Sequence, residues 1–286
     1  MIKGKLGSKE VGDGLPTLVV GVINLSPASF YQQSIASSSK NIEQISALMI
    51  EEGAQGLDIG AQSTRPIQIY GGEGRVNEET ELKMVKEAVE IVIDVSKSYS
   101  KIELSVDTTR SVVAEFAMSQ GIRTINDISG FKNDNKIAKI IADFDGSAVV
   151  MAAKEKPGDV FQIQDIIQEL ETSIEIGRRA GIDDEQIIID PGIGSWEARD
   201  FKHDYNIIQN LEDFRILNKP IYVGISRKTS IGKALNDAPP EERLFGSIGA
   251  TILATIQGAH IVRTHDVKPT LDAIRVTETI MNYKAS

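Results

Sequence analysis

The chain has 286 residues, of which 41% are hydrophobic and 25% charged, and its formal net charge is −10. This composition is that of a globular protein, and the acidic balance argues against a nucleic-acid partner, which would need a basic face. The absence of cysteine excludes disulfides, thiolate nucleophiles and cysteine metal sites. Residues 1–20 lack the basic-then-apolar order of a signal peptide, and no apolar run approaches the roughly 18 residues of a membrane span. We therefore expect a cytoplasmic protein with no membrane partner.

Along the chain, short β-rich runs alternate with longer segments of helical periodicity. Residues 1–16, which contain four glycines, are predicted to form an N-terminal hairpin or loop. Strands are predicted at 18–23, 55–59, 102–106, 122–125, 147–151, 187–189, 220–225 and 260–263. Helical segments are predicted at 41–52, 78–97, 110–119, 133–143, 161–180, 204–217, 241–258 and 267–283.

Eight βα units with nearly continuous apolar strands indicate a parallel sheet covered by helices. Because no linker divides the chain, we predict a single domain over residues 1–286. The predicted fold is α/β, a (β/α)8 TIM barrel over about residues 17–284 with the short N-terminal hairpin or loop outside it. A doubly wound open sheet is the alternative.

In such a barrel the active site lies at the carboxyl ends of the strands. Polar residues stand at this place in seven of the predicted strands: Asn24, Asp58, Asp107, Asn126, Asp127, Asp190, Ser226, Arg227, Lys228, Arg263, His265 and Asp266. Taken singly, each has a structural explanation, since aspartate often caps a helix and a lone histidine is often structural. Their occurrence together on one face of the barrel favours a site.

The charges of these residues divide into two groups. Serine and cationic side chains gather after strands seven and eight, the usual phosphate site of this barrel. They are Ser226, Arg227, Lys228, Arg263 and His265. Asp107, Asn126 and Asp190 follow strands three, four and six, where carboxylate and amide groups can bind a planar ring with N–H donors and a carbonyl. We therefore expect a ligand with a donor-rich heterocycle at one end and a phosphate at the other.

Seven motifs in order carry a family resemblance: "GVINLSPASF", "LDIGAQSTRP", "SVDTTR", "INDISGF", "IIIDPGIG", "GISRKTSIG" and "GSIGATILATIQGAHIVRTHDV". Together they resemble the dihydropteroate synthase family of pterin-binding barrels, over about residues 17–280. The resemblance implies an enzyme, a transferase of folate biosynthesis. Such an enzyme condenses 6-hydroxymethyl-7,8-dihydropterin pyrophosphate with p-aminobenzoate, and pyrophosphate leaves first to give a pterin carbocation. It also implies small-molecule substrates, a magnesium (Mg2+) cofactor and a homodimer.

Site residues follow from the same motifs. The resemblance implies that the pterin is held by Asp107, Asn126, Asp190 and Lys228. Pyrophosphate would be bound by Asn24, Arg263 and His265, with Asn24 also contacting the metal. The arylamine would be bound by Thr64, Arg65, Pro66 and Ser226. The candidates for catalysis are Lys228, Arg65 and Asp107.

The chain departs from the family pattern in three loops. Both aspartates of the first loop are missing, at Ala28 and at Gln32 or Gln33. Glu73 is one candidate to replace the lost charge, and Gln62 stands where the family usually has glutamate. The family's M-H-x-x-G after strand five is replaced by "MAAKEKPG". These departures leave two alternatives open. One is a sister transferase for a larger arylamine, such as a ribosylated aminobenzoate of a methanopterin-type cofactor. The other is a pterin-binding methyltransferase or non-catalytic pterin-binding protein.

Overall fold

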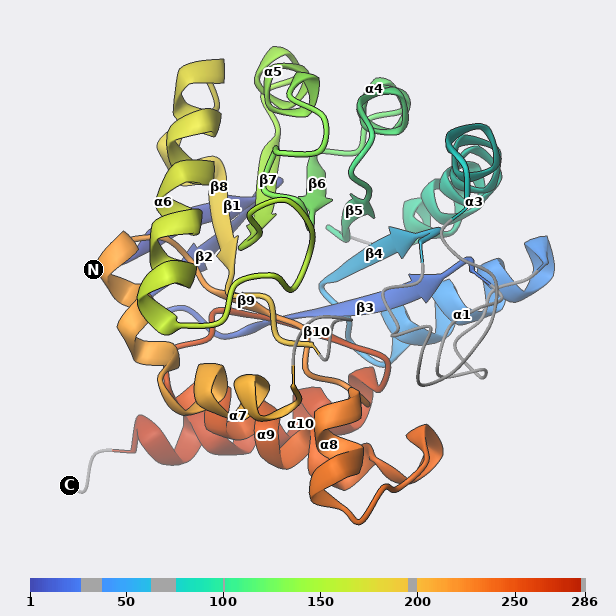
Figure 1. Cartoon of the computed structure of the whole chain (residues 1–286). Helices are drawn as coiled ribbons and strands as arrows, with labels where there is room; N and C mark the ends of the chain where they lie inside the picture. Colours follow the sequence, from blue (N-terminus) through green and yellow to red (C-terminus); the bar gives the residue numbers. More distant parts are fainter. Residues whose placement is uncertain (27–37, 63–75, 100, 195–199, 284–286) are drawn as a thin grey trace.

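Parallel strands form a barrel in the computed structural model, which describes residues 1–26, 38–62, 76–99, 101–194 and 200–283. The barrel strands are β3 (Leu18–Asn24), β4 (Gly56–Gly60), β5 (Glu103–Asp107), β6 (Thr124–Asp127), β7 (Ser147–Met151), β8 (Ile187–Asp190), β9 (Tyr222–Val223) and β10 (Ile261–Thr264). They pair in the order β8-β7-β6-β5-β4-β3-β10-β9, every pairing being parallel (Figure 1). The predicted (β/α)8 TIM barrel is confirmed.

The seam between β8 and β9 closes the barrel. An isolated parallel bridge joins Ile189 to Ile221, and Ile189 N donates to Pro220 O at 3.0 Å. At the amino-terminal end of this seam, Lys219 Nζ donates to Asp184 O at 2.5 Å and pairs with Asp184 Oδ1 at 2.6 Å. The seam is therefore held by few backbone contacts together with a buried lysine.

Helices cover the outside of the barrel. They are α1 (Ser39–Glu51), α3 (Glu78–Lys97), α4 (Ser111–Ser119), α5 (Lys136–Asp143), α6 (Ile163–Ala180), α7 (Lys202–Gln209), α8 (Thr229–Ala234), α9 (Leu244–Ile256) and α10 (Val267–Met281). Short 3-10 turns are η2 (Asp184–Gln186), η3 (Leu211–Leu217) and η4 (Pro240–Glu242). The predicted helical segment 204–217 divides at Asn210 into α7 and η3, and α8 was not predicted. None of the described helices has an apolar stretch of the length that a bilayer crossing requires.

Side chains alternate along each strand between the helices and the barrel interior. On β4, Leu57 and Ile59 belong to the main apolar core with Val85 and Val89 of α3. Asp58, between them, has an exposed fraction of 0% and faces polar side chains of other strands. The apolar layer thus lies between barrel and helices, and the interior is free to carry polar groups.

Residues 1–16 contain a hairpin, one of the two forms predicted for them, and it closes the amino-terminal end of the barrel. Its antiparallel strands are β1 (Lys3–Leu6) and β2 (Lys9–Gly12). Leu6 and Val11 pack in one cluster with inward-facing strand residues: Leu18, Val20, Val149, Ile188, Tyr222 and Ile261. Ser147 Oγ donates to Lys5 O at 2.8 Å and accepts from Gly7 N at 3.0 Å. This end of the barrel is a packed apolar plug.

A polar cluster anchors the hairpin. The Asp13 carboxylate accepts hydrogen bonds from Ile2 N at 2.7 Å, from Arg215 Nη2 at 2.9 Å and from His260 Nε2 at 3.2 Å. Ile221 N donates to His260 Nδ1, so Nε2 carries the imidazole hydrogen. Burial raises the pKa of Asp13, but the hydrogen bonds from Ile2, His260 and Arg215 outweigh it and lower that pKa to about 2.

Candidate active site

Asp58 lies at the centre of the polar barrel interior. Its Oδ2 accepts from Arg263 Nε at 2.6 Å and from Asn126 Nδ2 at 3.3 Å, and its Oδ1 accepts from Ser105 Oγ at 2.5 Å. These contacts join β4, β5, β6 and β10. The sequence places Asp58 at a strand end but does not indicate a role for it in the predicted site. Its position shows that it orients both Arg263 and Asn126.

Asp107 shares Arg263 with Asp58. Arg263 Nη2 lies 3.5 Å from Asp107 Oδ2. Burial, followed by the negative charge of Asp58, raises the pKa of Asp107 to about 7, although the charge of Arg263 opposes the shift. Near neutral pH the Asp107 carboxyl group can therefore accept a hydrogen bond when ionised or donate one when protonated.

Asn126 presents a buried acceptor beside this pair. Its side chain is 4% exposed and its Nδ2 is used by Asp58, while Oδ1 has no hydrogen-bond partner among the described residues. A buried unpaired carbonyl oxygen is costly, so it suits a ligand N–H group. Asp127, the next residue, stabilises the turn that follows β6, since its carboxylate accepts hydrogen bonds from Ser129 N and Phe131 N.

Asp190 and Lys228 stand on either side of the barrel seam. Asp190 Oδ1 accepts from Gly192 N at 2.7 Å, and Lys228 Nζ donates to Ile193 O at 2.6 Å. Next to them, Ile128 and Met151 form a small apolar cluster, with Met151 in register with Asp190. Polar edges around an apolar patch fit a flat heterocycle.

Asn24, Ser226 and His265 meet at the ends of β3, β9 and β10. Asn24 Nδ2 lies 3.3 Å from His265 Nε2, and Ser226 Oγ lies 3.1 Å from His265 Nδ1. Burial, then the positive charges of Arg263, Arg227 and Lys228, lower the pKa of His265 to about 3. The imidazole is therefore neutral in the free protein, within a group of cations that favours a phosphate.

Arg227 is placed differently from the sequence expectation of a phosphate-binding cation. It is 4% exposed, and its Nε and Nη2 pair with the Asp266 carboxylate at 2.8 and 2.7 Å. Nη1 donates to Pro240 O at 2.7 Å. The residue has a φ of 56°, the left-handed region, between Ser226 and Lys228. Arg227 thus ties the β9 and β10 loops together.

The remaining predicted residues lie outside the residues that the structure describes. They are Ala28, Gln32, Gln33, Thr64, Arg65, Pro66 and Glu73. Gln62, which directly precedes residues 63–75, is described, and it donates to Val76 O at 3.1 Å and to Glu81 Oε2 at 2.5 Å. The residues predicted to bind pterin and pyrophosphate converge at one end of the barrel, whereas the predicted arylamine set is represented there by Ser226.

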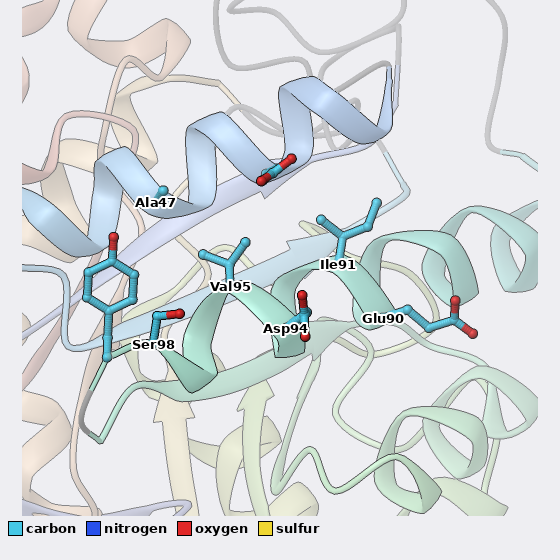
Figure 2. A pocket seen from close by; sticks show the side chains of 8 residues that line it. Ala47, Glu90, Ile91, Asp94, Val95 and Ser98 are labelled. Atoms are coloured by element: carbon cyan, nitrogen blue, oxygen red, sulfur yellow. The ribbon is translucent and has the colours of Figure 1, made fainter.

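A separate groove lies on the outside of the barrel between α1 and α3, with a volume of about 550 Å3 (Figure 2). Its lining includes the carboxylates of Glu43, Glu90 and Asp94 and the apolar side chains of Ile91 and Val95. This acidic lining would repel an anion and has no part in the strand-end cluster. The candidate active site is therefore the carboxyl end of the barrel.

Comparisons with known proteins identify the family of the chain. Residues 20–265 match the family model described as pterin binding enzyme. Dihydropteroate synthase of Clostridium beijerinckii is 35% identical over 97% of this chain and 99% of its own length. Dihydropteroate synthase of Bacillus subtilis is 35% identical over 93% of this chain and 89% of its own.

Solved structures give the same result. A dihydropteroate synthase from Coxiella burnetii, in complex with pteroic acid, superposes with a TM-score of 0.83 at 33% identity, covering 99% of both chains. The Xanthomonas albilineans enzyme with 4-aminobenzoic acid has a TM-score of 0.84 at 29% identity, again over 99% of both chains. The chain therefore belongs to the dihydropteroate synthase family of pterin binding enzymes.

Proposed function

We propose that this protein condenses 6-hydroxymethyl-7,8-dihydropterin pyrophosphate with p-aminobenzoate to give dihydropteroate and pyrophosphate. The observation that carries the proposal is the buried cluster of Asp58, Asp107, Asn126 and Arg263 at the carboxyl end of the barrel. It matches carboxylate and amide acceptors with the N–H groups of a pterin ring. Transferase activity in folate biosynthesis follows from the family to which the chain belongs.

In this proposal the pterin lies over the barrel interior. Asp107, Asn126 and Asp190 accept hydrogen bonds from its ring N–H and amino groups, and Lys228 donates to its carbonyl oxygen. The Asn126 Oδ1 atom, buried and unpaired among the described groups, supports this arrangement. The apolar pair Ile128 and Met151 supplies a surface for a ring face.

Pyrophosphate would be held by Asn24, Arg263 and His265. Its departure breaks the C–O bond, with the electron pair leaving on pyrophosphate, and leaves positive charge next to the ring. The buried carboxylates of Asp58 and Asp107 would stabilise that charge. The amine nitrogen then forms the C–N bond and loses its proton. We assign the arylamine to Thr64, Arg65, Pro66 and Ser226, and catalysis to Lys228, Arg65 and Asp107.

Magnesium (Mg2+) is part of the proposal. Among the described residues, no group of three or more His, Asp or Glu side chains could hold a metal ion. Asn24 offers an amide oxygen, the ligand type that magnesium prefers, beside the cations expected to bind the phosphates. These residues fit magnesium held jointly by Asn24 and substrate phosphate oxygens. When bound there, the ion would neutralise charge on the leaving group.

We further propose a homodimer. The buried side of α9 consists of small residues, three of them polar: Ser247, Thr251, Ala254 and Thr255. Its exposed side and that of the adjacent α10 carry apolar side chains: Phe245 (83% exposed), Ile256 (52%), Val276 (60%) and Ile280 (70%). Such an apolar surface is costly in water and is typical of an interface between copies of a chain. A single domain over residues 1–286 and a cytoplasmic location complete the proposal.

Turnover of the pterin pyrophosphate with magnesium, with and without p-aminobenzoate, tests the function. We expect pyrophosphate release coupled to dihydropteroate formation. Asp190→Ala should abolish binding of the pterin, because ring N–H groups would lose their partner. Pyrophosphate release without dihydropteroate would favour a larger arylamine. Binding without release would favour a non-catalytic pterin-binding protein.

A further inference from the structure

Glu81 is a buried carboxylate on α3, outside the barrel strands. It is 1% exposed and accepts hydrogen bonds from three side chains. Thr108 Oγ1 donates to Oε1 at 2.5 Å, while Arg110 Nη1 and Gln62 Nε2 donate to Oε2 at 2.6 and 2.5 Å. Burying a carboxylate is costly unless it is paired, and Arg110 supplies the positive charge. We call Glu81, Gln62, Thr108 and Arg110 the Glu81 junction.

One arm of the Glu81 junction reaches the pterin end of the site. Thr108 directly follows Asp107, and its backbone N donates to Asn126 O at 3.0 Å. The Thr108 hydroxyl bond to Glu81 therefore fixes the chain directly after β5, at the point where it contacts Asn126 of β6. Both predicted pterin acceptors lie next to this fixed point.

The other arm reaches both flanks of residues 63–75. Gln62 precedes this segment and Val76 follows it. Gln62 Nε2 donates to Val76 O at 3.1 Å and Arg110 Nη2 donates to the same oxygen at 2.8 Å. The Glu81 junction thus joins the chain entering and leaving the segment that carries Thr64 and Arg65, the proposed arylamine residues.

The glutamine at position 62 suits this arrangement. A carboxylate there would face Glu81 Oε2 and Val76 O, both of which are acceptors, and would have no hydrogen to donate when ionised. The amide supplies the donor. The departure of Gln62 from the usual glutamate of the family thus has a physical explanation within the Glu81 junction.

We propose that Glu81 is a positioning residue of the synthase, which sets Asp107 for the pterin through Thr108 and sets the flanks of residues 63–75 for the arylamine through Gln62. The inference rests on the proposed function. It predicts that the two arms can be separated, because each reaches a different substrate.

Substitutions that keep the side-chain shape but remove one hydrogen bond to Glu81, that of Thr108 or that of Gln62, test the proposal. Thr108→Val should raise the Kd of the pterin pyrophosphate about 10-fold and change the KM of p-aminobenzoate less than about 2-fold. Gln62→Met should raise the KM of p-aminobenzoate about 10-fold and change the Kd of the pterin pyrophosphate less than about 2-fold. Glu81→Gln should raise both the Kd and the KM. Thr108→Ser, which keeps the hydroxyl, should restore the pterin Kd. Glu87→Gln is the matched control, since this exposed carboxylate of α3 accepts from Ser39 at 2.8 Å and touches neither arm.

A pH profile separates positioning from a general loss of structure. Asp107 is surrounded by the charges of Asp58, Arg263, Glu81 and Asp127. Burial is the largest cause of its raised pKa, and the Glu81 charge adds to the shift. Glu81→Gln should therefore move the midpoint of pH-dependent pterin binding to lower pH.

Calorimetry with the pterin pyrophosphate alone measures the effect of the Thr108 substitutions on the Kd, even when the protein makes no dihydropteroate. Failure of the proposed function and failure of this inference are thus distinguishable. Equal changes of Kd and KM in Thr108→Val and Gln62→Met would overturn the proposal. A lowered Tm with unchanged Kd and KM would also overturn it, because it would leave Glu81 a purely structural role.

Discussion

The two ends of the barrel use the same chemical groups in opposite ways. At the amino-terminal end, among the described residues, the Asp13 carboxylate has Arg215 and His260 as partners, and its pKa is lowered to about 2. At the carboxyl end, Asp58 and Asp107 share Arg263, and the pKa of Asp107 is raised to about 7.

The difference lies first in burial, which is greater for Asp107 than for Asp13, and then in the balance of charge. A carboxylate with its own cation and N–H donors stabilises the fold when ionised, whereas two carboxylates beside one guanidinium leave negative charge uncompensated in a buried place. The hairpin end is thus optimised for stability. The strand-end cluster retains uncompensated negative charge, which fits the proposed active site at that end of the barrel.

The largest effect should come from removing the shared cation. Arg263→Met leaves the fully buried Asp58 without its charge partner. We expect the free energy of unfolding to fall by about 3–5 kcal/mol, and pyrophosphate affinity to fall at least about 100-fold. Urea unfolding measures the free energy of unfolding, and calorimetry measures the affinity for pyrophosphate. Arg215→Met is the control at the other end, where the partly exposed pair should contribute about 1 kcal/mol and leave affinity unchanged. Equal losses of pyrophosphate affinity in Arg263→Met and Arg215→Met would contradict the proposed difference between the two ends of the barrel.

An intermediate effect, opposite in sign at the two ends, is expected from neutralising the carboxylates. The folded state binds more protons than the unfolded state between pH 3.8 and about 7 at Asp107, so stability falls as the pH rises through this window. For Asp13 the stabilisation is present above pH 3.8 and is lost as the pH falls towards 2. At pH 8, Asp107→Asn should raise the free energy of unfolding by about 1–2 kcal/mol, and Asp13→Asn should lower it by about as much. Shifts of the same sign in urea unfolding would refute this comparison.

The smallest effect should appear in the histidine titrations. The pKa of His265 is lowered to about 3 by burial and by Arg263, Arg227 and Lys228, and burial also lowers the pKa of His260. Nuclear magnetic resonance should show both rings neutral at pH 7. Added pyrophosphate should raise the pKa of His265, because it offsets the neighbouring cations, and leave His260 unchanged. A pyrophosphate-induced shift of His260 instead would place the anion at the wrong end of the barrel.

The fold was predictable because its signals are local. Apolar β-rich runs at regular spacing locate the strands, and glycines mark the hairpin, so the predicted order and barrel closure agree with the structure. The short helix α8 follows directly after Lys228 and is too brief to show a periodic pattern. At Asn210 the backbone leaves the α-helical conformation and continues as the 3-10 turn η3, which contacts α6. The sequence pattern does not show this change.

The residues of the candidate site were predictable only where they stand at strand ends. Asn126 and Asp190 could be located in this way, and their convergence is seen in the structure. The role of Asp58 was not evident, because a strand-end aspartate is usually a cap or turn residue. Glu81 lies on the buried side of α3, one turn before Val85, and only this helical spacing separates it from the exposed Glu78 and Glu79. The direction of the Arg227 side chain depends on tertiary pairing with Asp266.

The seam between β8 and β9 has a consequence for local opening. Within the described residues, it combines the Ile189–Ile221 bridge with lysine contacts at both ends, Lys219 to Asp184 and Lys228 to Ile193. Such an edge is expected to open before the rest of the barrel in native-state hydrogen exchange, with Ile189 N–H as the reporting amide. A ligand that takes the Lys228 ammonium removes its bond to Ile193 O and supplies contacts of its own on both sides. Occupancy of the site and the exchange rate at the seam should therefore change together.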